Sequence, residues 1–225
     1  MDLPGQSGVL EEVMSAPSEK IAELDFLTKL QRILNEGLFV ASYKYALLLA
    51  LAELSVEKSI APDGTLRIEL EELADRFIAL YWRQVAPFGR GNILAFAKGR
   101  QASAINLIDE FKEKASTLTA ARAHPDWPRL VSKVGRLLVE MPLFKLQLVG
   151  EERLDFLYEE RLMDRGIILR PGIAACFRSQ FTIVQALVQT TWLAFMQRLN
   201  WQRLGSTADL ADFLFGCERS GLRKI

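Results

Sequence analysis

Basic side chains and glycines gather in the stretch that follows a tyrosine-tryptophan pair at positions 81 and 82. The basic residues are Arg83, Arg90, Lys98 and Arg100, and the glycines occupy positions 89, 91 and 99. Arginine and lysine bind phosphates, aromatic rings stack on bases, and glycine lets a loop backbone come close to a phosphate chain. These residue types therefore favour recognition of a nucleic-acid backbone.

The charge of the chain is unevenly distributed, although its 28 basic and 28 acidic residues cancel. Residues 1–75 have a net charge of −8, residues 76–136 of +7 and residues 137–225 of +1. From Arg76 to Ile108 the sequence has no acidic residue. A neutral protein can present a basic face if folding brings such residues to one surface. The alternative is that the aromatic pair closes the end of a core helix and the arginines only face solvent.

Other residues that could do chemistry lack partners in the sequence. The single histidine, His124, has Asp126 two positions away, whereas a general base or a metal ligand needs a convergent second group. Cys176 and Cys217 are 41 positions apart with no CxxC motif, and the chain has no HExxH, GxSxG, GxxxxGK[ST] or GxGxxG. We therefore predict no catalytic residue, no metal site and no cofactor in this chain.

The strongest helical pattern lies in residues 171–200. Its apolar stripe advances in steps of three and four residues, through Ile173, Phe177, Phe181, Val184, Val188, Trp192, Phe195 and Leu199. A single helix of this length would span roughly 42 Å. A membrane span is disfavoured because polar side chains lie within its uncharged part, among them Gln180, Thr182, Gln185, Gln189 and Gln197. We predict that residues 171–200 form the long central helix of the fold.

The remaining patterns predict a mainly α, multi-helix single domain. Helices are expected at 18–36, 41–59, 69–84, 101–115, 130–141 and 206–216. A short extended segment should follow the Pro62-Asp63-Gly64 turn, and at most a small β-hairpin is expected near 154–169. Residues 86–100 and 117–128 are expected to be loops. Residues 1–17 are expected to be a flexible N-terminal segment, with the helical domain over 18–225.

The N-terminus has acidic residues, no basic start and no long apolar run. This composition lacks the features of a secretory signal. Because the cysteine count also indicates no disulfide framework, we predict a cytoplasmic protein that does not enter a membrane.

Several phrases of the sequence together resemble a known group of proteins. SYKYALLLALAELSVEK, LEELADRFIALYWRQVAPF, DFLYE and IILRPGIAACFR are similar to the helical N-terminal region of bacterial HNH endonuclease-like proteins, as are the spaced Trp192 and Asn200 before DLADFLFG. The resemblance covers about residues 38–217. It consists of structural phrases and includes no catalytic signature.

In such relatives a nuclease module follows the helical region, with cysteine pairs of a zinc site and the His and Asn residues of the ββα-metal fold. The present sequence has no downstream CxxC pair and no second histidine, and Cys217 is followed by Glu218 and Arg219. We therefore transfer no zinc or catalytic role to it. The resemblance implies either a fragment of a longer nuclease or a shortened relative, connected to DNA metabolism or defence.

Two functions remain open at this point. The first is a non-catalytic nucleic-acid-binding module that positions DNA for a nuclease, using Arg83, Arg90, Lys98 and Arg100. The second is a protein-interaction or assembly domain with no direct nucleic-acid contact. Its acidic first third would then bind a nuclease partner or a second copy of the chain.

Overall fold

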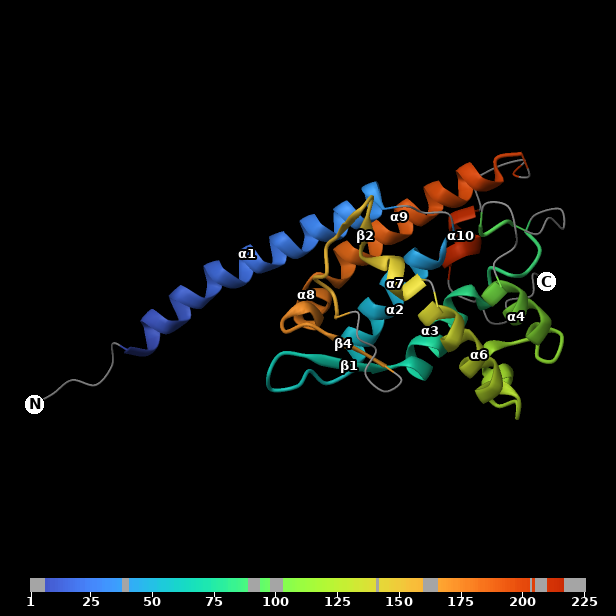
Figure 1. Cartoon of the computed structure of the whole chain (residues 1–225), viewed down its shortest axis with the longest axis horizontal. Coiled ribbons are helices and arrows are strands. Elements are labelled where there is room, and N and C mark those ends of the chain that lie inside the picture. Colours follow the sequence, from blue (N-terminus) through green and yellow to red (C-terminus); the bar gives the residue numbers. More distant parts are fainter. Residues whose placement is uncertain are drawn as a thin grey trace, which may run out of the picture.

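The computed structural model describes residues 7–37, 41–88, 94–97, 103–140, 142–159, 166–202, 204 and 210–216. This part of the chain is mainly helical, as predicted, and forms one domain (Figure 1). Its elements are α1 (Ser7–Glu36), α2 (Tyr43–Glu57), β1 (Leu66–Glu69), α3 (Leu70–Trp82), α4 (Ser103–Lys112), α5 (Leu118–Arg122), α6 (Trp127–Glu140), α7 (Pro142–Leu146), β2 (Leu148–Val149), β3 (Glu152–Arg153), β4 (Gly166–Leu169), α8 (Ile173–Ser179), α9 (Phe181–Asn200) and α10 (Leu210–Phe215).

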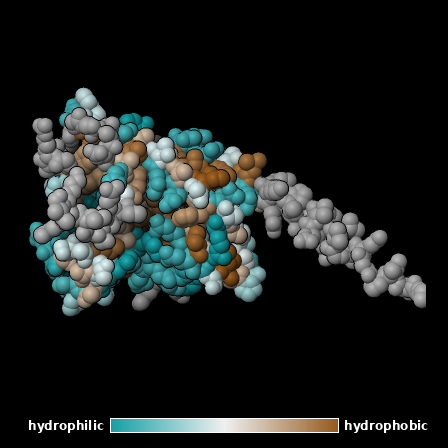
Figure 2. Space-filling view, turned by 180° about the vertical axis from the view of Figure 1, so that it is seen from behind, coloured by the Kyte–Doolittle hydropathy of each residue, from teal (hydrophilic) through white to brown (hydrophobic). Residues whose placement is uncertain are grey.

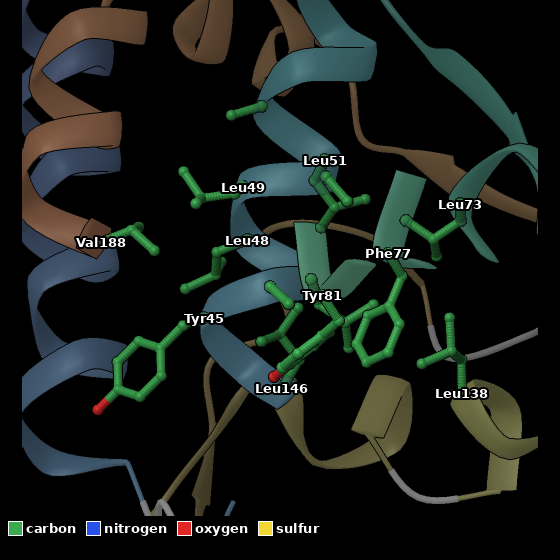
Figure 3. Close-up of a cluster of buried hydrophobic side chains, with 14 of the residues drawn as sticks. Tyr45, Leu48, Leu49, Leu51, Leu73, Phe77, Tyr81, Leu138, Leu146 and Val188 are labelled. Atoms are coloured by element: carbon green, nitrogen blue, oxygen red, sulfur yellow. The ribbon is translucent and has the colours of Figure 1, made fainter. Parts of the chain in front are cut away.

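The helix at the centre of the fold is α2, which corrects the prediction that residues 171–200 occupy this position. Every residue from Tyr45 to Ala52 is buried, because this part of α2 is apolar around its whole circumference. Helices α3, α7, α8 and α9 pack around it. Figure 3 shows α2 side chains directed both toward Val188 of α9 and toward Phe77 of α3. A helix that is apolar on all sides must be covered on all sides, and this requirement places α2 at the centre.

Residues 171–200 form two helices rather than one. The chain leaves helical geometry at Gln180 (φ −104°, ψ 18°), between α8 and α9. Ser179 Oγ and Gln180 Nε2 both donate hydrogen bonds to the carboxylate of Glu23 on α1, at 2.6 and 2.8 Å. Helix α9 buries only one face, and Ile183 on its other side is 47% exposed. The side of α9 opposite the apolar stripe is therefore partly at the surface.

Helix α1 begins at Ser7, eleven residues before the predicted start at Ser18. Pro17 lacks a backbone N–H and removes one hydrogen bond from a helix interior, but a helix can continue past such a loss. The backbone of residues 7–17 is therefore helical. The expected flexibility of this segment stays a prediction. The first half of α1 extends away from the other helices (Figure 1).

The small sheets show how the strands near 154–169 pair, where at most a small hairpin was predicted. Strand β4 lies in the predicted range, but it pairs with β1 in antiparallel register, Leu66 opposite Leu169. Tyr158 contributes only an isolated bridge to Leu169, and the one hairpin within the described residues is β2–β3, at 148–153. Gly166 is required at the start of β4 because a Cβ there would lie 2.6 Å from the Ile68 carbonyl oxygen.

The other predicted helices are present as α2, α3, α4, α6 and α10, with boundaries that differ by a few residues. The predicted loop 117–128 instead contains α5. Thr117 caps this short helix by accepting a hydrogen bond from the backbone N–H of Ala120 at 3.1 Å. Pro142, expected only to end a helix, is the first residue of α7, a position where a missing backbone donor costs nothing.

One face of the molecule can be followed by hydropathy. In the view from behind, hydrophobic side chains lie in small groups among hydrophilic ones (Figure 2). No described helix combines the length and the apolar character that a bilayer span requires.

Candidate nucleic-acid interface

A short described segment, residues 94–97, lies between the two halves of the predicted basic loop and is firmly attached to the core. Leu94 and Phe96 are buried, and the Phe96 ring packs edge-to-face against Tyr81 at 5.6 Å between centroids. The backbone N–H of Ser42 donates to the Phe96 carbonyl oxygen at 2.9 Å, and Ala97 forms a β-bridge with Ala41. The loop is thus fixed at its middle.

The C-terminal end of α9 holds the same segment from the other side. Asn200 Oδ1 accepts from the backbone N–H of Ala95 at 2.6 Å, and its Nδ2 donates to the Ala95 carbonyl oxygen at 3.0 Å. The Asn200 side chain is buried, so these bonds replace the water that its amide would otherwise bind. Segment 94–97 is therefore clamped between the start of α2 and the end of α9, and we call this arrangement the anchor cluster.

The hydroxyl groups of Ser42, Tyr81 and Tyr43 complete the anchor cluster. Ser42 Oγ and the Tyr81 hydroxyl lie 2.6 Å apart, and burial raises the pKa of Tyr81 well above its ordinary value. The Tyr43 hydroxyl accepts from the backbone N–H of Ala104 at 3.1 Å, at the start of α4. Burial raises the pKa of Tyr43 to about 12, so both phenols are neutral at physiological pH. They act here as structural hydrogen-bonding groups.

Of the four predicted phosphate-binding residues, only Arg83 is described. It follows α3 as its C-cap, and its guanidinium donates a hydrogen bond to the Gly216 carbonyl oxygen at the end of α10. The same guanidinium lies 3.9 Å from the Asp212 carboxylate, and the neighbouring Gln84 donates to the Leu214 carbonyl oxygen at 3.3 Å. Arg83 thus fastens α3 to α10.

Arg90, Lys98 and Arg100 lie outside the described residues, as do the three loop glycines. The described residues that flank them are attached to the core. Phe88 packs edge-to-face on Phe213 of α10 at 4.9 Å between ring centroids. Leu94 and Ala97 belong to the clamped segment, and Ser103 begins α4 beside the Tyr43 hydroxyl. Residues 98–102 therefore begin and end next to the anchor cluster, whereas residues 89–93 begin beside α10 and end at the anchor cluster.

A pocket that the sequence reasoning did not predict lies beside the anchor cluster. It has a volume of about 490 Å³ and lies between the C-terminal ends of α1 and α9. We call it the Trp201 pocket, lined mainly by Leu34, Tyr45, Phe195, Arg198, Leu199 and Trp201. Trp201 is 70% exposed, the largest exposed fraction among the large hydrophobic side chains described. The only sequence signal was a tryptophan placed directly after the apolar stripe of α9.

The His124 side chain makes contacts with neighbouring residues. Its Nδ1 accepts a hydrogen bond from the backbone N–H of Asp126 at 3.1 Å, and its ring packs edge-to-face on Phe111 at 5.4 Å. Asp126 in turn binds the ammonium group of Lys114 at 2.6 Å. The Asp126 carboxylate lies 3.9 Å from His124 Nδ1, and the arrangement shapes the turn before α6.

Within the described residues, no group of three or more His, Cys, Asp or Glu side chains is arranged to hold a metal ion. Cys176 is half-buried on α8, and burial raises the pKa of its thiol, which disfavours the nucleophilic thiolate. Cys217 lies outside the described residues. The described side chains thus assemble neither a metal centre nor an activated cysteine.

A second surface has the opposite charge. A groove of about 610 Å³ between α3 and α6 has an apolar floor that includes Leu54, Trp127 and Val131. We call it the acidic groove, because its rim carries Glu57, Glu71, Glu72 and Asp75 against one arginine, Arg76. Arg76 pairs with Glu57, and Asp75 accepts from the Trp127 indole at 3.1 Å. An apolar floor with an acidic rim suits a basic amphipathic segment.

Comparison of the chain with protein-family models, with curated proteins and with solved structures finds no match.

Proposed function

We propose that this chain is a non-catalytic helical module that binds nucleic-acid phosphates, with Arg90, Lys98 and Arg100 as its principal contacts and Arg83 at their edge. The single observation that carries the proposal is the anchor cluster. Leu94, Ala97 and Ser103, at the ends of the acid-free basic stretches, are attached to it, and Phe88 is fixed on Phe213 of α10. Described residues on both sides of Arg90, Lys98 and Arg100 are thus fixed to the folded core.

The electrostatics of the sequence support the same conclusion. Segment 94–97 lies within the sequence region of net charge +7, and the run from Arg76 to Ile108 contains no acidic residue of its own. Phosphate contacts from arginine and lysine supply most of the affinity of non-specific nucleic-acid binding. The proposed class of ligand is therefore a nucleic-acid backbone, with no sequence preference required.

The resemblance to the helical region of HNH endonuclease-like proteins gives this binding a purpose, which is to position DNA for a nuclease module. This part of the proposal is tested by reading the gene beyond Ile225. A following segment with paired cysteines and further histidines would support it. A short unrelated end to the reading frame would contradict the interpretation as a fragment of a nuclease.

Salt dependence tests phosphate binding directly. Each neutralised phosphate releases counterions, so log affinity for duplex DNA falls with log salt by about 0.9 per contact. The three principal contacts predict a slope near −2.7 by the same relation. Changing Arg90 and Lys98 together to Ala should flatten the slope by nearly two units. Binding is measured by fluorescence anisotropy of a labelled duplex at several salt concentrations.

A matched control pair is available on α6, where Lys133 and Arg136 are both exposed. Changing these two residues to Ala removes the same net charge from a surface remote in sequence from the basic loop. The slope should then change much less than in the Arg90/Lys98 variant. Equal effects of the two double variants would reduce the proposal to a general effect of net charge. No measurable DNA binding at low salt would remove it.

The alternative function, a protein-interaction domain, is favoured by the acidic groove. Of its four rim carboxylates, Glu57 pairs with Arg76, Glu72 with Lys58 and Asp75 with Arg122. No ion pair of Glu71 is found with a described residue. A basic segment of a partner or of a second copy would fit this surface. Changing Glu71 and Asp75 to Lys should abolish such an association, as measured by analytical ultracentrifugation, and should leave DNA binding in place.

A further inference from the structure

The Trp201 pocket combines aromatic walls with an exposed tryptophan at its rim. Tyr45 and Phe195 form one wall, with ring centroids 5.7 Å apart, and Tyr45 is backed by Trp192 in a stacked arrangement at 6.1 Å. These rings are buried and fixed by the core. Trp201, at the C-cap of α9, is held by its backbone while its indole faces solvent. Rigid aromatic walls and an accessible indole suit a flat aromatic ligand.

The charge of the pocket comes from Arg198. It is exposed in the last turn of α9, and no ion pair is found between it and any residue that the structure describes. Its guanidinium acts on Tyr45, where it opposes the rise in pKa that burial causes. The described lining of the pocket contains no carboxylate. A ligand that combines a planar aromatic ring with a negative charge therefore matches this lining.

We propose that the Trp201 pocket binds one unstacked nucleobase, which stacks on the Trp201 indole, while Arg198 contacts the adjacent phosphate. Base–aromatic stacking is the general means by which proteins hold single strands without reading their sequence. A volume of about 490 Å³ lies within the range of small-molecule sites. The pocket is therefore large enough for a base with its sugar and phosphate.

The pocket lies near the residues proposed to contact nucleic-acid phosphates. The inference therefore rests on that proposed function. Leu199 and Trp201 line the pocket, and Asn200 between them binds Ala95 in the anchor cluster. A strand whose phosphates lie on the basic loop would thus reach the pocket at the other side of the same clamp. Single-stranded nucleic acid is the ligand that uses both surfaces, because the bases of a duplex are stacked and unavailable.

The tryptophans of the chain provide a direct measurement. Trp82, Trp127 and Trp192 are buried, so quenching of intrinsic fluorescence by a stacked base reports on Trp201. We expect a thymidine oligonucleotide of 15 residues to quench the emission and a 15-base-pair duplex to leave it nearly unchanged. Trp201→Ala should abolish the quenching and weaken binding of the oligonucleotide about 5- to 100-fold.

Two further variants separate stacking from charge. Trp201→Phe keeps an aromatic ring, so binding measured by anisotropy should stay within about threefold while the fluorescence signal is lost. Arg198→Ala should flatten the salt dependence of single-strand binding by about 0.7, the value for one phosphate contact on a single strand. Arg198→Lys should retain the slope. Because both side chains are exposed, melting temperatures should change by little.

The outcomes separate this inference from the proposed function. Salt-dependent duplex binding without quenching, and with Trp201→Ala as strong a single-strand binder as the parent, would overturn the pocket alone. Absence of binding to either nucleic acid would overturn both. Thymidine monophosphate distinguishes the sources of the ligand. If the mononucleotide quenches at the same concentration as the oligonucleotide, the ligand of the pocket is a free nucleotide. If only the oligonucleotide quenches, the ligand is a single strand.

Discussion

The side-chain amide of Asn200 binds both backbone groups of Ala95, as a neighbouring strand would. Its Oδ1 accepts from the Ala95 N–H at 2.6 Å, and its Nδ2 donates to the Ala95 carbonyl oxygen at 3.0 Å and to the Met196 carbonyl oxygen at 3.0 Å. The two residues are 105 positions apart in the chain. One amide therefore joins the end of α9 to the middle of the basic loop.

Changing Asn200 to Ala should destabilise the fold by about 2 to 3 kcal/mol, because two partly buried backbone groups of Ala95 lose their partner. The loss of stability should affect the region around Ala95 more strongly than the rest of the fold. Hydrogen exchange at the Ala95 amide should accelerate more than exchange in α2. Asn35→Ala is a control with the same chemical change at an exposed position of α1, and its unfolding midpoint in urea should match that of the parent. Equal midpoints for both variants would contradict the clamp.

Changing Arg83 to Ala should act mainly on stability. The guanidinium donates to the Gly216 carbonyl oxygen, and a hydrogen bond from a charged group contributes about 1.5 to 3 kcal/mol. Because the group is partly exposed and its ion pair with Asp212 is long, we expect a loss near the lower end and easier proteolysis of α10. A drop of almost one unit in the salt slope with unchanged stability would instead identify Arg83 as a full phosphate contact.

Much of the helical content could be predicted from the sequence because apolar residues at helical spacing determine which segments pack. The alternation of Leu66 and Ile68 likewise identified β1. Neither pattern indicates a partner, however. Strand β1 pairs with β4 about one hundred residues later, and the local sequence near 154–169 suggested a hairpin instead. The central position of α2 also depended on how many neighbours cover it, which is a property of the whole fold.

The sequence indicated which residue types make up the candidate site, but it did not indicate how the fold holds them. The acid-free run and the loop glycines indicated a phosphate-binding surface, and this hypothesis stays a prediction. The clamp was not predictable, since a single asparagine in an apolar helix shows only that its amide needs partners. Helix α5 was missed because five residues are too short for a visible period. Trp201 carried no motif, and its exposure became visible only with the fold.

Changing Trp192 to Ala should cost about 3 to 5 kcal/mol of unfolding free energy. Its side chain is fully buried and contacts Tyr45, Tyr81 and Phe215, with ring centroids 6.1, 5.5 and 5.4 Å away. Its indole N–H is buried and has no hydrogen-bond partner among the described residues, so Trp192→Phe should cost at most about 2 kcal/mol. Phe181→Ala is the control, with a smaller loss than Trp192→Ala because Phe181 is only partly buried.

The purified chain should not hydrolyse DNA in the presence of Mg²⁺, Mn²⁺ or Zn²⁺. Metal-dependent cleavage needs ligands that hold the ion against the scissile phosphate and a base that activates water. The described side chains assemble no such group, and His124 is bound to the backbone of Asp126. Supercoiled plasmid provides a sensitive assay. Cleavage that is lost when His124 is changed to Ala would refute the prediction, whereas cleavage that persists in this variant would indicate a contaminant or another site.

Lys44 should make the stability of the protein depend on pH. The residue is 6% exposed, near the start of α2, and its Nζ lies 3.4 Å from the Leu148 carbonyl oxygen. Burial, with a smaller contribution from Lys145, lowers the pKa of its amine from 10.5 to about 8. Between pH 8 and pH 10.5 the unfolded chain therefore holds a proton that the folded chain has released. Stability from this group rises with pH across that window and is lowest where the amine is charged in both states.

Changing Lys44 to Met should remove this rise and should stabilise the fold at pH 7, by about 1 to 3 kcal/mol, because a buried charge is replaced by an apolar side chain of similar length. The measurement is urea unfolding of parent and variant at pH 7, 8, 9 and 10. The two free energies of unfolding should converge as pH increases, since the folded parent then loses the charge that costs it stability. Lys133→Met, a change at an exposed position of α6, controls for the loss of a positive charge. A constant difference between Lys44→Met and the parent over this range would contradict the lowered pKa, and a less stable Lys44→Met at pH 7 would show that the contacts of the amine outweigh its burial.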